Sequence, residues 1–436
     1  MKLSAFGTKL TGESGILQLM DDLGRPFPDG VKPHRLGGGN PARVPQVEQV
    51  YRREMERLMG FHDAFEQVIS AYDAPQGRHL FLDAVASFFR REYGWPVTPE
   101  NVAVTNGSQA AFFYLFNLLS GKSPERRTIL FPLVPEYIGY ADQGIDPGCF
   151  VTLPARIEPD GEHLFKYFID LPLVEEYLAA HPEVAALCVS RPTNPTGNVL
   201  TDGEIRSLAA LARRYGIPLM IDNAYGTPFP NIIYPDRMYD GTGVEPVPYW
   251  DENTILSMSL SKIGLPTLRT GIVIAPPDVI KAVSAVNSIA ALASGSLGQV
   301  LAEGLIRTGE LKKLADNAVR PFYKSRLEKA LDWTAEFWTG RNYRLHRCEG
   351  ALFLWMMMDD LRVSSRDLYF RLKEKGVVVV PGEYFFFGLE SGSPEETAWK
   401  NHPHRYSCLR INYTGNPDEV RDGLRLIAST SAELRR

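Results

Sequence analysis

The stretch Ser259-Leu260-Ser261-Lys262, followed by Arg269-Thr270-Gly271, is the part of this chain from which its fold can be worked out. It directly follows Thr254-Ile255-Leu256-Ser257-Met258, which predicts a strand that ends at these residues. A lysine amine can form a Schiff base with an aldehyde, and small hydroxyl side chains beside an arginine can bind a phosphate. The stretch therefore indicates pyridoxal 5′-phosphate, bound covalently by Lys262 and through its phosphate by Ser259, Ser261 and Arg269.

Two strand ends upstream carry side chains that would complete such a site. The apolar run at 184–189 leads into Ser190-Arg191-Pro192-Thr193-Asn194-Pro195-Thr196-Gly197, whose prolines and glycine favour a rigid turn around Asn194. The run at 217–221 leads into Asp222-Asn223-Ala224-Tyr225. Because α/β enzymes place their chemistry at the carboxyl ends of parallel strands, we expect these side chains to lie near Lys262.

The residue types at these strand ends suit the chemistry of this cofactor. A carboxylate facing the pyridine nitrogen keeps it protonated, so that the ring can accept electrons from the substrate Cα, and we assign this role to Asp222. Hydrogen bonds from an amide and a phenol favour the anionic ring oxygen, and Asn194 and Tyr225 provide these groups. If each occurred alone, Asp222 would indicate a helix cap, Asn194 a turn and Tyr225 a core residue. Their ordered occurrence with Lys262 favours a site.

A fourth element, Asn106-Gly107-Ser108-Gln109, separates a predicted strand at 102–105 from the start of a predicted helix. Backbone amides and the helix dipole attract an anion to such a position, and a glycine allows the backbone to approach it closely. We therefore expect Gly107, Ser108 and Gln109 to contact the cofactor phosphate.

Together these motifs resemble those of the class I/II aminotransferases of the pyridoxal-phosphate-dependent fold type I superfamily, and the resemblance covers nearly the full chain. It extends to the stretches at 36–41 (LGGGNP), 72–77 (YDAPQG), 135–140 (PEYIGY) and 409–413 (LRINY). The longer strings at 190–199 and 257–266 imply a reversible ping-pong reaction of L-valine with pyruvate. Its products would be 3-methyl-2-oxobutanoate and L-alanine, and Lys262 would form the Schiff base and carry the proton.

The resemblance also implies further roles at matching positions. Arg410 would bind the substrate α-carboxylate, with contacts from Gly39 and Asn194. Tyr72 would reach the cofactor phosphate of a second subunit, which implies a homodimer with a shared active site. Many relatives stack an aromatic ring on the cofactor where this chain has Val134.

Other residues of this chain are candidates for the ring contact and for the substrate pocket. Either Tyr137 or Tyr140 is expected to stack on the cofactor, and Tyr137 is the residue we assign. Ile16 and Leu17 are candidates for lining the pocket of the substrate side chain.

The order of predicted elements indicates an α/β protein with two domains, since 436 residues exceed what one hydrophobic core usually organises. Strands alternate with helices from about residue 100 to 275, which is typical of a mostly parallel sheet between helices. We expect a large cofactor-binding domain at 50–311. A smaller α+β domain would be formed by both termini, at 1–49 and 312–436.

Composition excludes several other classes. A net charge of −5 does not predict a basic surface that would bind nucleic acid. No apolar run is long enough for a membrane helix. The first residues lack the apolar block of a signal peptide, and four widely spaced cysteines fit a reducing compartment, so a cytoplasmic location is expected. The pair His402 and His404 flanks a proline without nearby thiols or carboxylates, so no metal site is expected.

Two alternatives remain open. Fold and cofactor motifs do not fix which Cα bond breaks, so an aminotransferase of different specificity, a β-lyase or a decarboxylase would fit the same scaffold. A non-catalytic amino-acid sensor is the more distant alternative, and the retained Lys262 argues against it.

Overall fold

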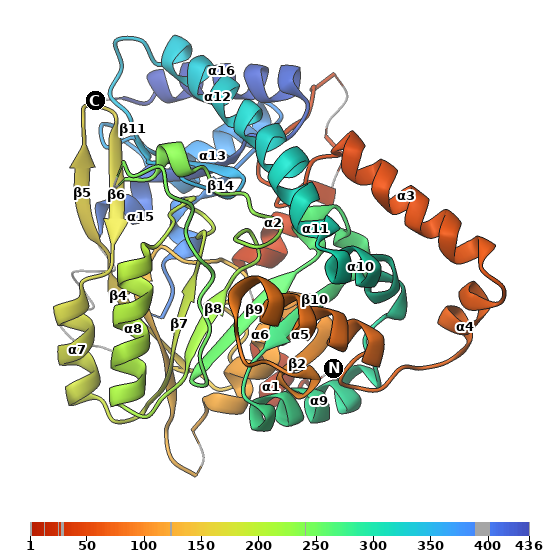
Figure 1. The fold of residues 1–436 in the computed structure, drawn as a ribbon. Coiled ribbons are helices and arrows are strands. Elements are labelled where there is room, and N and C mark those ends of the chain that lie inside the picture. The colour runs from red at the N-terminus through yellow and green to blue at the C-terminus, as the bar shows by residue number, and fades with distance from the viewer. Residues whose placement is uncertain are drawn as a thin grey trace.

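The computed structural model describes residues 2–12, 14–24, 26–27, 30–122, 124–239, 241–388 and 402–435. Two large sheets organise these residues, one of seven strands and one of six. Figure 1 shows the seven-stranded sheet in the lower half of the molecule and the six-stranded sheet above it. A short parallel pair, β1 (His34–Arg35) with β13 (Val377–Val378), joins the N-terminal and C-terminal segments.

The seven-stranded sheet has the order β2-β10-β9-β8-β7-β3-β4. Its strands are β2 (Val102–Asn106), β3 (Thr128–Val134), β4 (Phe150–Pro154), β7 (Val184–Ser190), β8 (Leu219–Asp222), β9 (Thr254–Ser259) and β10 (Thr270–Ile274). Strand β10 runs antiparallel to both of its neighbours, and the other pairs are parallel. The carboxyl ends of β7, β8 and β9 therefore meet at one edge of the sheet, as their sequences predict.

Successive side chains along these strands point to opposite faces of the sheet, and both sets are apolar, so both faces are covered. In β7, Leu187 and Val189 belong to one apolar cluster, whereas Ala186 and Cys188 belong to another on the opposite face. Successive side chains of a strand point to opposite faces, so a strand that is apolar throughout needs helices on both. Helices α5 (His79–Tyr93), α8 (Asp202–Arg214) and α10 (Ser296–Thr308) pack on the first face, and α6 (Ser108–Leu119) and α9 (Pro277–Ala291) on the second.

The six-stranded sheet has the order β14-β15-β12-β11-β6-β5. Its strands are β5 (Arg156–Asp160), β6 (Leu164–Phe168), β11 (Arg344–His346), β12 (Phe353–Met357), β14 (Val380–Pro381) and β15 (Cys408–Asn412). All of its pairs are antiparallel except β6 with β11. Strands β5 and β6 come from the range expected for the large domain, yet β6 pairs with the C-terminal strand β11, and β5 pairs with β6 at the edge of the same sheet. The placement of the domain boundaries stays a prediction.

The remaining helices connect and flank these sheets. They are α1 (Ala5–Leu10), α2 (Gly15–Gly24), α3 (Pro45–Gly60), α4 (Ala64–Ser70), α7 (Leu171–Ala180), α11 (Glu310–Leu314), α12 (Arg320–Phe337), α13 (Ser365–Glu374), α15 (Pro403–Ser407) and α16 (Pro417–Ala432). A π-helical turn, Ala315–Val319, joins α11 to α12, so one long helical segment runs from the lower to the upper half of the molecule (Figure 1). Helices α3 and α4 extend from the body as an arm (Figure 1).

Within the described residues, no helix is long and apolar enough to cross a membrane. The predicted architecture, a mostly parallel sheet between helices with a smaller α+β unit beside it, is confirmed.

Candidate active site

A cavity of about 500 Å³ lies where β7, β8 and β9 end. All of the predicted site residues except Gly107 and Tyr72 line it: Gly39, Ser108, Gln109, Tyr137, Asn194, Asp222, Tyr225, Ser259, Ser261, Lys262, Arg269 and Arg410. The fold thus brings together side chains that are up to 371 positions apart along the chain, from Gly39 to Arg410.

Lys262 lies in a short 3-10 turn, Ser261–Ile263, directly after β9. Its Nζ donates to the carbonyl oxygen of Gly39 at 2.5 Å and lies 5.5 Å from the centre of the Tyr225 ring. Burial, followed by the positive charges of Arg410 and Arg269, lowers the pKa of Lys262 to about 8. A substantial fraction of this amine is therefore neutral, and nucleophilic, near neutral pH.

Asp222 is the last residue of β8, and its carboxylate is buried. One oxygen accepts from the backbone N–H of Ala224 at 3.0 Å, and the other accepts from the hydroxyl of Tyr140. Burial raises the pKa of Asp222 to about 6, although both hydrogen bonds and Lys262 oppose this rise. The carboxylate is therefore held in one orientation and is charged at neutral pH.

A cradle suited to a phosphate forms where β2 meets α6. Gly107 has a φ of +85°, and a Cβ added there would lie 2.2 Å from Nη2 of Arg269. Only glycine fits this position, because any side chain would collide with the guanidinium. Arg269 donates to Oγ of Ser261 at 3.2 Å, and Ser108 begins α6, so a guanidinium, hydroxyl groups and helix N–H groups converge.

Arg410 is buried on β15, and its guanidinium lies close to two aromatic rings. Its Cζ lies 4.3 Å from the ring centre of Phe353 and 5.2 Å from that of Phe385. Nη1 donates to Oδ1 of Asn194 at 2.8 Å, and Nη2 donates to the carbonyl oxygen of Gly37 at 2.5 Å. Burial lowers the pKa of Arg410 to about 10, which still leaves it charged at neutral pH, and Nε has no hydrogen-bond partner among the residues that the structure describes. A buried guanidinium with a free donor is suited to a carboxylate ligand.

The two tyrosines considered for the ring contact occupy different places. Tyr137 lines the cavity, and its ring lies so close to Gly139 that a Cβ there would be 2.3 Å from it. Tyr140 is buried behind it, with its hydroxyl group on Asp222. The geometry therefore favours Tyr137 for contact with a ligand and gives Tyr140 a role in fixing Asp222.

Tyr72 lies outside the cavity. It follows α4 and is 83% exposed, so it makes no contribution to the site of its own chain in this structure. The expected role in the site of a second subunit stays a prediction.

Sequence reasoning missed two parts of the site. The buried carboxylate of Glu136 accepts from Ser190 Oγ at 2.6 Å and from the backbone N–H of Tyr137 at 2.8 Å, so it joins β7 to the Tyr137 loop. Burial raises the pKa of Glu136 to about 8. The glutamate stands in the motif at 135–140, but its spacing alone gives no sign of this contact.

The second missed part is the extent to which α2 covers the cavity. Its residues Ile16, Leu19, Met20 and Leu23 line one side and make that side apolar. Leu17, one of the two expected lining residues, points away and is 53% exposed. Ile16 therefore agrees with its expected place and Leu17 does not.

Comparison with known proteins decides the family. The family model described as aminotransferase class I and II matches residues 39–427. The chain belongs to the class I and II aminotransferases. Among curated proteins, it is 41% identical over 433 residues to a valine–pyruvate aminotransferase from Escherichia coli (strain K12), covering 98% of this chain and 97% of the relative.

Solved structures of class I and II aminotransferases agree with this assignment. A structure from Psychrobacter arcticum 273-4 is 41% identical with a TM-score of 0.92, over 100% of this chain and 99% of that one. The valine–pyruvate aminotransferase from Salmonella typhimurium LT2 is 40% identical with a TM-score of 0.83, over 96% and 98%.

Class I and II aminotransferases use pyridoxal 5′-phosphate and act on amino-acid and 2-oxo-acid substrates. The residues present fit this cofactor. Gly107 has no side chain and so lets the Arg269 guanidinium lie against the start of α6, Lys262 presents an amine that is partly neutral near neutral pH, and Asp222 presents a fixed carboxylate.

Proposed function

We propose that this aminotransferase catalyses the reversible transfer of an amino group from L-valine to pyruvate, which yields 3-methyl-2-oxobutanoate and L-alanine. The observation that carries the proposal is the 41% identity, over 98% of the chain, to a valine–pyruvate aminotransferase. The cavity supports it, because its lining combines apolar side chains of α2 with a buried arginine.

When bound, pyridoxal phosphate holds the amino group between the two half-reactions and accepts the negative charge that develops at the substrate Cα. We propose that Ser108, Gln109, Ser259, Ser261 and Arg269 hold its phosphate. Asp222 would face its ring nitrogen, and Asn194 and Tyr225 its ring oxygen. Tyr137 would lie against the ring.

Lys262 is proposed to bind the cofactor aldehyde and, once released, to move the proton of the substrate Cα. A pKa of about 8, lowered by burial and by two arginines, suits a base that must both take up and return a proton near neutral pH. The carbonyl oxygen of Gly39, 2.5 Å from Nζ, gives the free amine a fixed position.

Arg410 is proposed to bind the α-carboxylate of both substrates. It is already held by Asn194 and Gly37, so a carboxylate meets a guanidinium that loses little freedom on binding. The substrate side chain would then point toward the apolar wall formed by α2, which suits the branched group of valine.

We further propose a homodimer in which Tyr72 completes the site of the second subunit. The exposure of Tyr72 and its position next to the projecting α3–α4 arm support this arrangement. A cytoplasmic location, expected from the cysteine usage, also stays a proposal; all four cysteines are free and buried.

A spectrophotometric half-reaction tests the proposed function. Purified protein loaded with pyridoxal phosphate is mixed with excess L-valine, the visible absorbance of the cofactor is followed, and pyruvate is then added. We expect the visible band to disappear with valine and to return with pyruvate. If only other amino acids removed the band, the valine–pyruvate assignment would be wrong; release of ammonia or carbon dioxide without a need for a 2-oxo acid would favour a lyase or a decarboxylase.

A further inference from the structure

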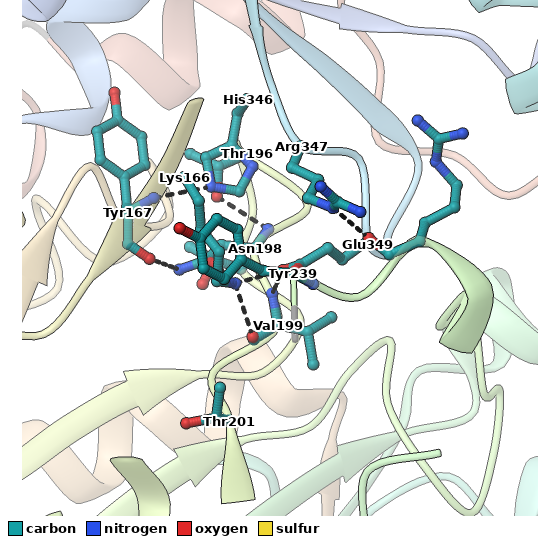
Figure 2. Close-up of polar contacts among 12 residues, drawn as sticks. Lys166, Tyr167, Thr196, Asn198, Val199, Thr201, Tyr239, His346, Arg347 and Glu349 are labelled. Carbon is teal, nitrogen blue, oxygen red and sulfur yellow. Dashed lines mark hydrogen bonds and ion pairs between the residues drawn. The ribbon is translucent and has the colours of Figure 1, made fainter. Parts of the chain in front are cut away.

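A fully buried ion pair lies beside the active site, between Lys166 on β6 and Glu349 in the segment that leads to β12. Its two charged atoms are 2.5 Å apart, and both side chains have an exposed fraction of 0%. Figure 2 shows the pair at the centre of a group of polar side chains and backbone groups. None of the roles assigned above uses these two residues.

Both charged groups of the pair make several hydrogen bonds to nearby polar groups. Nζ of Lys166 donates to Glu349, to Oδ1 of Asn198 at 2.7 Å and to the carbonyl oxygen of Val199 at 3.1 Å, which uses its three hydrogens. Glu349 also accepts from the backbone N–H of Val199 at 3.0 Å and from that of Tyr239 at 2.8 Å. Burying two charges costs free energy even when they are paired, so the pair is weak evidence for stability and needs another explanation.

The contacts of the pair converge on the turn that carries Asn194. Val199 is held at both its N–H and its carbonyl group, and the Asn198 side chain is held between Lys166 and the carbonyl oxygen of Tyr167 at 3.1 Å. The carbonyl group of Asn198 accepts from the backbone N–H of Thr193 at 2.8 Å and thereby closes the turn around Asn194. Lys166 and Glu349 thus fix one end of this turn against the six-stranded sheet.

The segment that begins at Glu349 also leads to Arg410, the second residue of the proposed carboxylate site. The next residue, Gly350, packs so tightly on the turn that a Cβ at Gly197 would lie 2.5 Å from its carbonyl oxygen. The same segment continues into β12, whose first residue, Phe353, lies 4.3 Å from the Arg410 guanidinium. The ion pair therefore connects the turn that carries Asn194 to the segment that packs on Arg410. The side chains of Asn194 and Arg410 are themselves hydrogen-bonded at 2.8 Å.

We propose that Lys166 and Glu349 are positioning residues that hold Asn194 and Arg410 in the geometry required to bind the substrate carboxylate. The proposal rests on the proposed function, because it takes Arg410 as the carboxylate ligand. It predicts that disturbing the pair weakens the binding of amino and 2-oxo acids more than it slows turnover at saturation.

Four variants of the full-length, cofactor-loaded protein test this: Lys166→Met, Glu349→Gln, the double variant that combines them, and Arg347→Met as a control. Arg347 pairs with Asp160 close by and donates to the carbonyl oxygen of Arg237 at 2.6 Å, so its loss breaks a neighbouring ion pair. Steady-state kinetics give KM and kcat, calorimetry gives the Kd of isovalerate as an unreactive carboxylate, and thermal unfolding gives Tm.

We expect Lys166→Met to raise KM for both substrates, and the Kd of isovalerate, about tenfold while kcat falls less than about threefold. Its Tm should also fall, because Glu349 is left as an unpaired buried charge. In the double variant Tm should recover while KM stays high, since Asn198 still lacks its lysine. The control should change Tm with KM unchanged.

The proposal is overturned if KM and the Kd of isovalerate stay at wild-type values in Lys166→Met, or if they recover in parallel with Tm in the double variant. If Lys166→Met does not fold, the test uses Glu349→Gln, which keeps the shape of the side chain. Wild-type values of KM and of the Kd of isovalerate in that variant would then overturn the proposal. Failure of the proposed function is seen separately in the wild type, as a lack of turnover of L-valine with pyruvate. The KM of each variant would then be compared with that of the wild type for whichever amino acid the wild type accepts.

Discussion

The charge environment of Lys262 makes its titration a direct test of the site at the scale of single residues. The cofactor-free protein should show a lysine pKa of about 8, which carbon-13 NMR of reductively methylated protein measures and Lys262→Arg assigns. Arg410→Met removes a positive charge that lowers this pKa, so the pKa should rise. Asp222→Asn removes a negative charge that raises it, so the pKa should fall further. A pKa unchanged by both substitutions would mean that these groups do not face the amine.

Arg410 provides a second test at this scale. Arg410→Ala should raise KM for amino and 2-oxo acids by at least about a hundredfold, because two charge-assisted hydrogen bonds to the carboxylate are lost, each worth about 1.5–3 kcal/mol. The cofactor should remain bound, which its visible absorbance checks. Arg421→Ala, at a half-exposed arginine near Phe337, is the control and should leave KM unchanged. Loss of the cofactor from Arg410→Ala would show that the arginine has another role.

Residues at strand ends could be predicted from the sequence, whereas residues that support them could not. Lys262, Asp222 and Asn194 follow apolar runs, and parallel strands that end at one edge place such residues together. Tyr140 and Glu136 were not assigned their contacts, because a buried hydrogen bond between distant segments has no spacing pattern. The pairing of Lys166 with Glu349 spans 183 positions and gave no sign in the sequence for the same reason.

At the scale of elements, α2 is the feature that links the N-terminal segment to substrate choice. Two hydrogen bonds anchor it to distant segments: Ser14 next to its start donates to Asp142 at 2.6 Å, and Tyr384 donates to Gln18 at 2.5 Å. Asp22 near its end is paired with Lys373 at 2.5 Å. The helix therefore presents its apolar side chains to the cavity in a fixed orientation.

Ile16→Ala should lower kcat/KM for L-valine about tenfold relative to L-alanine, since a side chain that contacts apolar groups contributes about 0.8 kcal/mol per buried methylene. The measurement is kcat/KM for both amino acids. Leu17→Ala is a matched control, because the neighbouring residue lies on the exposed side of the same helix. Equal effects of the two substitutions, or an equal loss for both amino acids from Ile16→Ala, would show that α2 does not select the side chain.

The strands themselves illustrate which parts of the fold are visible in sequence. The run at 184–189 in β7 is apolar throughout and predicts a sheet covered on both faces. Strand β5 pairs with its neighbour β6, whereas β6 also pairs with β11, which lies far along the chain. Local pattern predicts that a strand exists, but pairing across such a distance depends on how the two sheets pack.

The whole molecule presents an apolar surface around the projecting arm. Met59, Phe61 and Ile69 on or beside α3 and α4 are each more than 60% exposed, and Tyr72 follows them. Large apolar side chains that gather on one exposed element mark an interaction surface. The proposed occupant is a second copy of this chain, with Tyr72 reaching its cofactor site.

Hybrid dimers test this arrangement because the two defects would lie in different subunits. Lys262→Ala destroys the site of its own chain, and Tyr72→Ala would damage the site of the partner, so each variant alone should have little activity. When equal amounts are unfolded together and refolded, half of the dimers are hybrids with one complete site, and about a quarter of the wild-type activity should return. Sedimentation velocity of the wild type should show a dimer. Activity no higher than the sum of the separate variants would mean that Tyr72 serves no neighbouring site, and a monomer that turns over substrate at full rate would exclude the shared site altogether.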